Sequence, residues 1–112
     1  MSKSRRIGTG FESAIVGWLR GEGFDAERLT LSGNLDEGDV VVRDGAVTII
    51  EAKAERSIDL SSYVNEAKVE RDNYCRKRSL DPSAVDAVAV VKRRGKSIGE
   101  AYVVTTLDEY FA

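Results

Sequence analysis

The spacing of apolar residues changes several times along the chain, from helical to strand-like and back. From Gly10 to Arg20 apolar side chains recur at every third or fourth position, and Gly21 and Gly23 follow, which predicts a first helix. Shorter segments with a strand-like composition come next. They are Ala26 to Leu31, Asp39 to Val42 and Val47 to Lys53.

A second helix and two further strands are predicted in the rest of the chain. Within Ile58–Ser79 one apolar stripe runs among many charges, Asp59 can cap the start, and Pro82 prevents much continuation, so we predict a long helix. Strands are predicted at Val85 to Val91 and Ala101 to Thr105, and a short helix at Leu107 to Phe111. This order predicts one α/β domain over residues 1–112, with a mixed five-stranded sheet flanked by helices.

The turn between the second and third strands decides which of their side chains share a face. Asp44 and Gly45 between two β-rich segments are typical of a hairpin. A two-residue turn at these positions places Asp39 opposite Ile50, facing away from Glu51. A three-residue turn that starts one position earlier, with Gly45 in the left-handed conformation, places Asp39 on the Glu51 side. A bulge just before Asp39 would have the same effect, and the sequence leaves these geometries open.

Charged residues share a face with core residues at the end of the third strand. Side-chain alternation places Glu51 and Lys53 on the same face as Val47 and Ile49. Burying two charges is costly unless they are paired or bind an ion. One interpretation is a solvated ion pair at a point where the strand has left the core. The other is a functional site, which Asp39 favours, because it opens the partner strand of the same hairpin.

Glu12 is a further acidic candidate, on the first predicted helix. It shares a helical stripe with Ile15, Val16 and Leu19 and is expected to point toward the sheet. The alternative is a capping box that starts at Thr9, in which the Glu12 carboxylate folds back to the Thr9 amide. We favour the catalytic interpretation of Glu12 only because Asp39, Glu51 and Lys53 supply the other residues of such a site.

The composition limits the available chemistry. The chain has no histidine and a single cysteine, Cys75, which excludes catalysis through an imidazole and argues against a zinc site. No phosphate-binding loop or dinucleotide-binding motif is complete, so no nucleotide cofactor is expected. The apolar segments are too short to span a membrane and the start lacks the apolar stretch of a signal peptide, which predicts a cytoplasmic protein.

Positive charges are bunched along the chain. The net charge of −2 alone argues against a nucleic-acid partner, but local clusters matter more than the total. The clusters that could bind DNA phosphates are Lys3, Arg5 and Arg6 near the start, and Lys92, Arg93, Arg94 and Lys96 in the turn before the last strand. Solvated helix ends and a charged turn explain each cluster about as well.

Converging carboxylates and a lysine favour metal-dependent hydrolysis. Asp39 and Glu51, if they share a face, suit Mg²⁺ or Mn²⁺, which prefer oxygen ligands and keep several waters. Lys53 beside the ion can orient a water or stabilise negative charge that builds on a phosphorane. The predicted reaction is cleavage of a phosphodiester.

The same residues carry a resemblance to a known group of nucleases. Gly38-Asp39-Val40, followed by Glu51-Ala52-Lys53 twelve residues after the aspartate, resembles the PD-(D/E)xK nuclease motif, although the proline of that motif is missing. With Glu12 on a preceding helix and the predicted order of elements, the chain is most similar to archaeal-type and phage Holliday junction resolvases. The resemblance covers nearly the whole chain and implies a restriction-endonuclease-like core.

The resemblance also implies roles for individual residues. Asp39 and Glu51 would be ligands of Mg²⁺ or Mn²⁺, Lys53 would be the catalytic lysine, and Glu12 would be an acid that assists the metal or its water. Ser32 matches a hydroxyl residue that such resolvases often carry before the aspartate.

Partners follow from the same resemblance. Such resolvases cut four-way DNA junctions as homodimers, and exposed aromatic residues are the expected contacts between subunits. The candidates are Tyr63, Tyr110 and Phe111, which could equally pack within one subunit. Two other functions stay open: a repair, restriction or replication nuclease of the same superfamily, and a non-catalytic DNA-binding module of the same fold.

Overall fold

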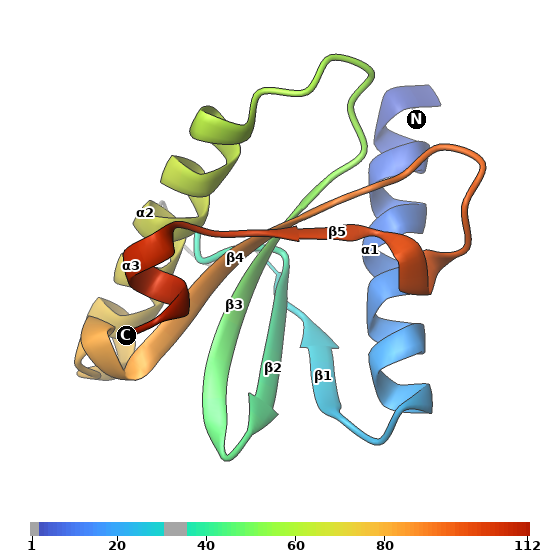
Figure 1. Cartoon of the computed structure of the whole chain (residues 1–112). Coiled ribbons are helices and arrows are strands. Elements are labelled where there is room, and N and C mark those ends of the chain that lie inside the picture. The colour runs from blue at the N-terminus through green and yellow to red at the C-terminus, as the bar shows by residue number, and fades with distance from the viewer. Residues whose placement is uncertain (1–2, 31–35) are drawn as a thin grey trace.

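Two long helices and a five-stranded sheet make up most of the chain (Figure 1). The computed structural model describes residues 3–30 and 36–112, with side chains from residue 10 onward. The helices are α1 (Lys3–Gly21), α2 (Leu60–Arg78) and α3 (Leu107–Tyr110), and 3-10 turns occupy Pro82–Ala84 and Ile98–Glu100. The strands are β1 (Asp25–Arg28), β2 (Val40–Asp44), β3 (Ala46–Lys53), β4 (Val85–Val91) and β5 (Tyr102–Val104). No helix in these ranges is long and apolar enough to cross a bilayer.

The strands lie side by side in the order in which they follow one another in the sequence. β3 and β4 are parallel, and the other neighbouring pairs are antiparallel. A parallel pair needs a long crossover connection, which α2 supplies. α1 and α2 lie on opposite faces of the sheet (Figure 1), so the predicted mixed sheet with flanking helices is confirmed.

Alternating side chains of the central strands contribute to two separate cores. The core on the α1 side contains Phe11, Ile15, Val16, Val40, Val42, Ile50 and Val90. The core on the α2 side contains Val41, Ile49, Tyr74, Cys75 and Val85. Val40 and Val41 are both fully buried and face opposite cores, as the pleat of a strand requires. Because each such side chain contributes about 1.5–3 kcal/mol when buried, the cores hold β2 and β3 in one register.

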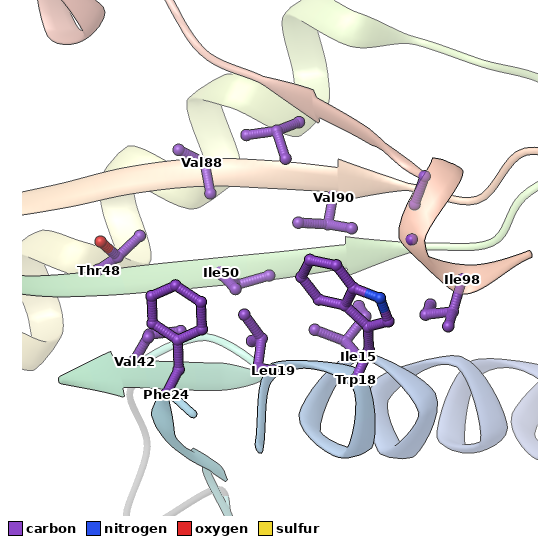
Figure 2. A pocket seen from close by; sticks show the side chains of 13 residues that line it. Ile15, Trp18, Leu19, Phe24, Val42, Thr48, Ile50, Val88, Val90 and Ile98 are labelled. Carbon is purple, nitrogen blue, oxygen red and sulfur yellow. The ribbon is translucent and has the colours of Figure 1, made fainter. Parts of the chain in front are cut away.

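An apolar pocket of about 310 Å³ lies on the α1 side of the sheet (Figure 2). Trp18 of α1, Ile50 of β3 and Val90 of β4 are among the residues that line it. Thr48 and the indole of Trp18 supply the polar side-chain atoms of its lining, and no ionisable side chain takes part. Hydrolytic chemistry that needs charges therefore has to lie elsewhere, at the ends of the strands.

Two predictions about element ends and exposure are wrong. α1 begins at Lys3 rather than Gly10, so Thr9 lies inside the helix and the capping-box interpretation of Glu12 fails. The first turns of α1 are polar, and apolar periodicity could not reveal them. Tyr63 is 2% exposed and packs against Ala89 and Val91 within the subunit, so it is not available as a contact between subunits.

The β2–β3 hairpin places Asp39 on the Glu51 side of the sheet. The two strands pair as far as Asp44 and Ala46, which leaves Gly45, at φ +76°, between them. The predicted left-handed Gly45 and the shared facing of Asp39 and Glu51 are therefore confirmed, although the turn is centred one residue later than predicted. A regular two-residue turn would have directed Asp39 to the opposite face.

Gly38, which precedes Asp39, generates a prediction about stability. Its φ is +103°, and a Cβ there would come 2.6 Å from Ile49 Cγ2 and 3.6 Å from Glu70 Oε2. We predict that Gly38→Ala lowers the free energy of unfolding by about 2–4 kcal/mol, because overpacking and left-handed strain add. Urea denaturation followed by circular dichroism measures this.

Gly45→Ala is the matched control for Gly38→Ala. Gly45 also has a positive φ, but a Cβ there would meet nothing within 4 Å. The free energy of unfolding of Gly45→Ala should fall by about 1–2 kcal/mol, because only the left-handed backbone strain applies there. Equal losses in the two variants would show that the space around Gly38 is not tightly packed.

Candidate active site

Asp39 is held at the open end of the β2–β3 hairpin by three hydrogen bonds. Its N–H donates to the Ile50 carbonyl (3.0 Å), its carbonyl accepts from Leu29 N–H (2.8 Å), and its Oδ2 accepts from Ala52 N–H (2.8 Å). One carboxylate oxygen is thus engaged by the β3 backbone, and the carboxyl group also lies against those of Glu12 and Glu51. The half-buried aspartate is positioned by strands on both sides of it.

Glu51 and Lys53 extend from the end of β3 on the face that α2 covers. Glu51 is buried, and the Lys53 side chain is 15% exposed. Lys53 Nζ lies 3.9 Å from Glu51 Oε2 and 2.6 Å from Oε2 of Glu66 on α2. It also lies 5.2 Å from the centre of the Tyr63 ring. The interpretation of Glu51 and Lys53 as a solvated ion pair is therefore wrong, because Glu51 is buried and Lys53 is largely covered by α2.

Glu12 reaches the same place from the opposite face of the sheet. Its side chain is 19% exposed, and its Oε2 lies 3.6 Å from Nη2 of Arg28 on β1. The Asp39 carboxyl is close enough to contribute to the raised pKa of Glu12. The structure thus brings together Glu12 of α1, Asp39 just before β2, and Glu51 of β3.

Two acidic residues that the sequence prediction missed lie in the same cluster. Asp36 precedes β2, Glu70 lies on the buried side of α2, and a carboxylate oxygen from each is within 4.8 Å of Glu51 and of the other. The signal for Glu70 was its spacing, because it falls on the stripe that also holds Ala67 and Tyr74. Asp36 lies in a polar loop where no pattern distinguishes it.

Burial and mutual repulsion raise the proton affinity of the clustered carboxyl groups. Burial raises the pKa of Glu12 to about 7, with a further contribution from Asp39 and an opposing one from Arg28. Burial likewise raises the pKa of Glu70 to about 7. Burial, reinforced by Asp39 and Glu70, raises the pKa of Glu51 far above its ordinary range. The cluster therefore favours bound protons or a bound cation over free ionised carboxylates.

Lys53 remains charged beside this cluster. Burial alone would lower its pKa, but the hydrogen bond to Glu66 and the nearby Glu51 outweigh burial, so the pKa of Lys53 is raised. The same hydrogen bond lowers the pKa of Glu66. The site thus joins a fixed positive charge to carboxyl groups that titrate near neutral pH.

The basic turn between β4 and β5 lies at the same end of the sheet as these residues. Lys92 N–H donates to the Lys53 carbonyl at 2.9 Å, which ties the turn to the end of β3. Lys92, Arg94 and Lys96 are exposed. The turn and α1 line a groove of about 330 Å³ between them. The exposed charges are thus positioned to meet a ligand that enters at this end.

The remaining predicted DNA contacts are less accessible or lie outside the described side chains. Arg93 pairs with Glu100 at 3.4 Å, and its guanidinium lies 4.8 Å from the centre of the Tyr102 ring. The helical turns at the start of α1 carry three others, whose side chains are not described: Lys3, Arg5 and Arg6. Ser32 lies outside the described residues.

The donor set of the cluster fits a hard divalent cation. All its ligand atoms are carboxylate oxygens, which Mg²⁺ and Mn²⁺ prefer. Lys53 adds a compact positive charge next to the oxygens. Such an arrangement can polarise and hydrolyse a phosphate ester without an imidazole or a side-chain nucleophile.

Comparisons with known proteins show the fold and the family of the chain. The solved structure of Archaeoglobus fulgidus Hjc, a Holliday junction resolvase from an archaeal hyperthermophile, is similar with a TM-score of 0.53 and 20% identity. The match covers 80% of this chain and spans 66% of the length of that protein, and it shows a shared fold. No curated protein matches the sequence. A family model described as archaeal Holliday junction resolvase (Hjc) matches residues 3–104, and the chain therefore belongs to that family.

Proposed function

We propose that the chain is a metal-dependent, structure-selective DNA endonuclease that resolves Holliday junctions. Residues 1–112 would form a single PD-(D/E)xK nuclease domain that acts in the cytoplasm. The observation that carries the proposal is the convergence of Glu12, Asp39, Glu51 and Lys53 at one end of the sheet. Membership of the resolvase family supports the choice of a branched substrate.

Glu12, Asp39 and Glu51 would hold Mg²⁺ or Mn²⁺. The residues fit such an ion, because three carboxyl groups meet at Asp39 and the donors are all oxygens. Glu51 is buried, and among the described side chains Lys53 is the one basic group within ion-pair distance of it. When bound, the ion supplies Lewis-acid polarisation of a phosphoryl oxygen.

Lys53 and Glu12 would act on either side of the scissile phosphate. Glu66 holds the Lys53 ammonium at 2.6 Å, so its charge is already oriented when DNA arrives. There it can stabilise the negative charge that builds on the phosphate oxygens in the transition state. Glu12, whose carboxyl lies beside Asp39, would assist the ion or orient the attacking water.

DNA would be bound at the end of the sheet that carries these residues. Lys92, Arg94 and Lys96 would contact phosphates there, and Arg93 could contribute after it leaves Glu100. The first turns of α1, with Lys3, Arg5 and Arg6, would extend the same contact. Ser32 is proposed to contact DNA on the basis of its match to the hydroxyl residue of such resolvases.

A homodimer would supply the two cuts that a four-way junction requires. The junction has two-fold related strands, and each chain carries one cluster, so a closed two-fold dimer is the simplest assembly. Tyr110 and Phe111 are 73% and 75% exposed and stack edge to face at 4.9 Å. They are the aromatic residues that we propose as contacts between subunits.

The function can be tested with a labelled four-way junction, a flap and a linear duplex, with and without Mg²⁺. We predict paired nicks in the junction that require Mg²⁺. Asp39→Asn and Glu51→Gln should each lower cleavage by more than about 100-fold, because a ligand is lost, while junction binding is kept or strengthened, because a charge that repels phosphate is removed. Denaturing gels and mobility shifts measure the two effects.

Asp44→Asn, at the exposed tip of the hairpin, is the matched control and should cut normally. Near wild-type turnover of Asp39→Asn or Glu51→Gln would show that the metal site is misassigned. Equal cutting of flap and duplex would indicate another nuclease of the superfamily. Junction binding without any cleavage would indicate a non-catalytic module.

The dimer predicts a specific result when subunits are mixed. Exchange of wild-type chains with Lys53→Ala chains should give dimers that nick one junction strand and leave its two-fold mate intact, because each subunit cuts one strand. Strand-specific labels on a denaturing gel distinguish single from paired nicks. If the mixture yields only paired nicks, in proportion to its content of wild-type chains, the two cuts are not made by two different subunits.

The raised pKa of Glu12 predicts a dependence of stability on pH when metal is removed. The folded protein holds this proton up to about pH 7, whereas the unfolded chain releases it near the ordinary value of 4.5. The contribution of the Glu12 carboxyl to the free energy of unfolding is therefore complete below about pH 4.5, and it is lost as the pH rises toward 7. In EDTA, the stability of Glu12→Gln relative to wild type should increase by about 1–3 kcal/mol across this window.

Mn²⁺ should remove or reverse this difference at neutral pH, because a cation favours the ionised form of Glu12. Urea denaturation at a series of pH values, with EDTA or Mn²⁺, measures both effects. If the stability difference between Glu12→Gln and wild type is constant from pH 4.5 to 7 in EDTA, Glu12 does not hold a proton in the folded state.

A further inference from the structure

Glu70 of α2 carries a buried carboxylate oxygen without a partner. The residue is 5% exposed, and its Oε2 is fully enclosed and accepts no hydrogen bond from the described part of the chain. Buried polar atoms are nearly always satisfied, since an unsatisfied one costs free energy. The orphaned oxygen therefore points to a ligand that is not part of the polypeptide.

The surroundings of Glu70 bring other oxygens close to it. Gly38 packs tightly against Ile49 beside Oε2, and a Cβ there would lie 3.6 Å from that oxygen, so only a glycine lets the chain pass this close to Glu70. Asp36 is fixed by two hydrogen bonds, from Gly38 N–H to its Oδ1 (2.9 Å) and from Asn73 Nδ2 to its carbonyl (2.8 Å). Carboxylate oxygens of Asp36, Glu51 and Glu70 lie within 4.8 Å of one another.

In the described ranges Lys53 is the one basic side chain within ion-pair distance of these oxygens, and a single ammonium cannot balance three carboxylates. Lys53 Nζ is 3.9 Å from Glu51 and is bonded more closely to Glu66, at 2.6 Å. The basic residues at the end of α2 pair with another acid, since Arg78 and Lys77 both contact Glu37. The oxygens therefore need positive charge from solution or bound protons.

We propose that Asp36, Glu51 and Glu70 hold a divalent cation at a position of their own, next to the one proposed for Glu12, Asp39 and Glu51. Glu51 lies between the two positions. Oxygens within 4.8 Å of one another can meet a common ion, because Ca²⁺–oxygen contacts are about 2.4 Å and a small inward movement brings them to the ~2.1 Å of Mg²⁺. This inference deepens the proposed nuclease function and rests on it.

A groove of about 570 Å³ along α2 borders the position on the side of Asp36 and Glu70. Asp36, Glu66 and Glu70 line this groove, together with Ser62, Asn65 and Asn73. The hydroxyl and amide groups leave space for the waters that Mg²⁺ and Mn²⁺ retain. A cation here would offset the acidic lining and allow a DNA phosphate to approach Lys53 from the α2 side. Two cations that share a carboxylate are suited to phosphodiester cleavage.

Mn²⁺ binding to the free protein, without DNA, tests the proposal. Titration followed by the electron paramagnetic resonance of unbound Mn²⁺ should count two ions per wild-type chain. Glu70→Gln should weaken one of them by at least about tenfold and keep the other, and Asp36→Asn should do the same. Asp39→Asn should keep the ion that Glu70→Gln weakens, and the double variant Asp39→Asn/Glu70→Gln should lose both.

Glu22→Gln is the control for loss of one negative charge, since Glu22 is exposed in the turn after α1, and it should bind two ions like wild type. A single ion that is unaffected by Glu70→Gln and Asp36→Asn overturns the proposal. Asp36 is exposed, so Asp36→Asn keeps the test valid even if the buried substitution impairs folding.

A purely structural Glu70, kept neutral by a proton, makes a different prediction. In that case wild type and Glu70→Gln gain the same stability from Mn²⁺ in urea denaturation, whereas the proposed cation position requires a larger gain for wild type. The result is independent of cleavage. If the protein cuts junctions but Mn²⁺ stabilises wild type and Glu70→Gln equally, the second cation position alone is contradicted. If the protein binds two ions but cuts no DNA, the proposed function is contradicted.

Discussion

The burial of several carboxyl groups in one place is the constraint on which the site depends. They come from α1, from the β2–β3 hairpin and from α2, and they meet where two strands end between two helices. Ionised together, they would repel one another and oppose folding. The apolar cores on both faces of the sheet hold them in place regardless. The raised pKa values of Glu12 and Glu70, which make these groups easier to neutralise, and the ammonium of Lys53 both counter this repulsion.

The parts of the structure that could be predicted are those that repeat with the period of a helix or strand. Alternation along β3 was enough to place Glu51 and Lys53 on one face, because every strand has a period of two. The Asp-Gly pair narrowed the hairpin to a few registers, one of which directs Asp39 to Glu51. Helical spacing placed Glu12 toward the sheet, and the order of elements predicted the mixed sheet.

The parts that could not be predicted depend on contacts between elements distant in sequence. The bond between Lys53 and Glu66 joins β3 to α2, and no spacing within either element reveals it. Glu70 was detectable by the argument applied to Glu51, a charge on an apolar stripe, but the many other charges of α2 obscured that stripe. Asp36 acquires its position from a loop that Asn73 holds, which is a tertiary contact.

The register of the hairpin also restricts how the sequence can change in length. Inserting or deleting one residue between Asp39 and Glu51 would turn over every side chain of β2, so that Asp39 and Val41 would face α1 while Val40 and Val42 faced α2. A change of two residues would restore the original facing. Relatives that keep this cluster are therefore expected to vary the spacing by even numbers, or to absorb an odd residue in a bulge.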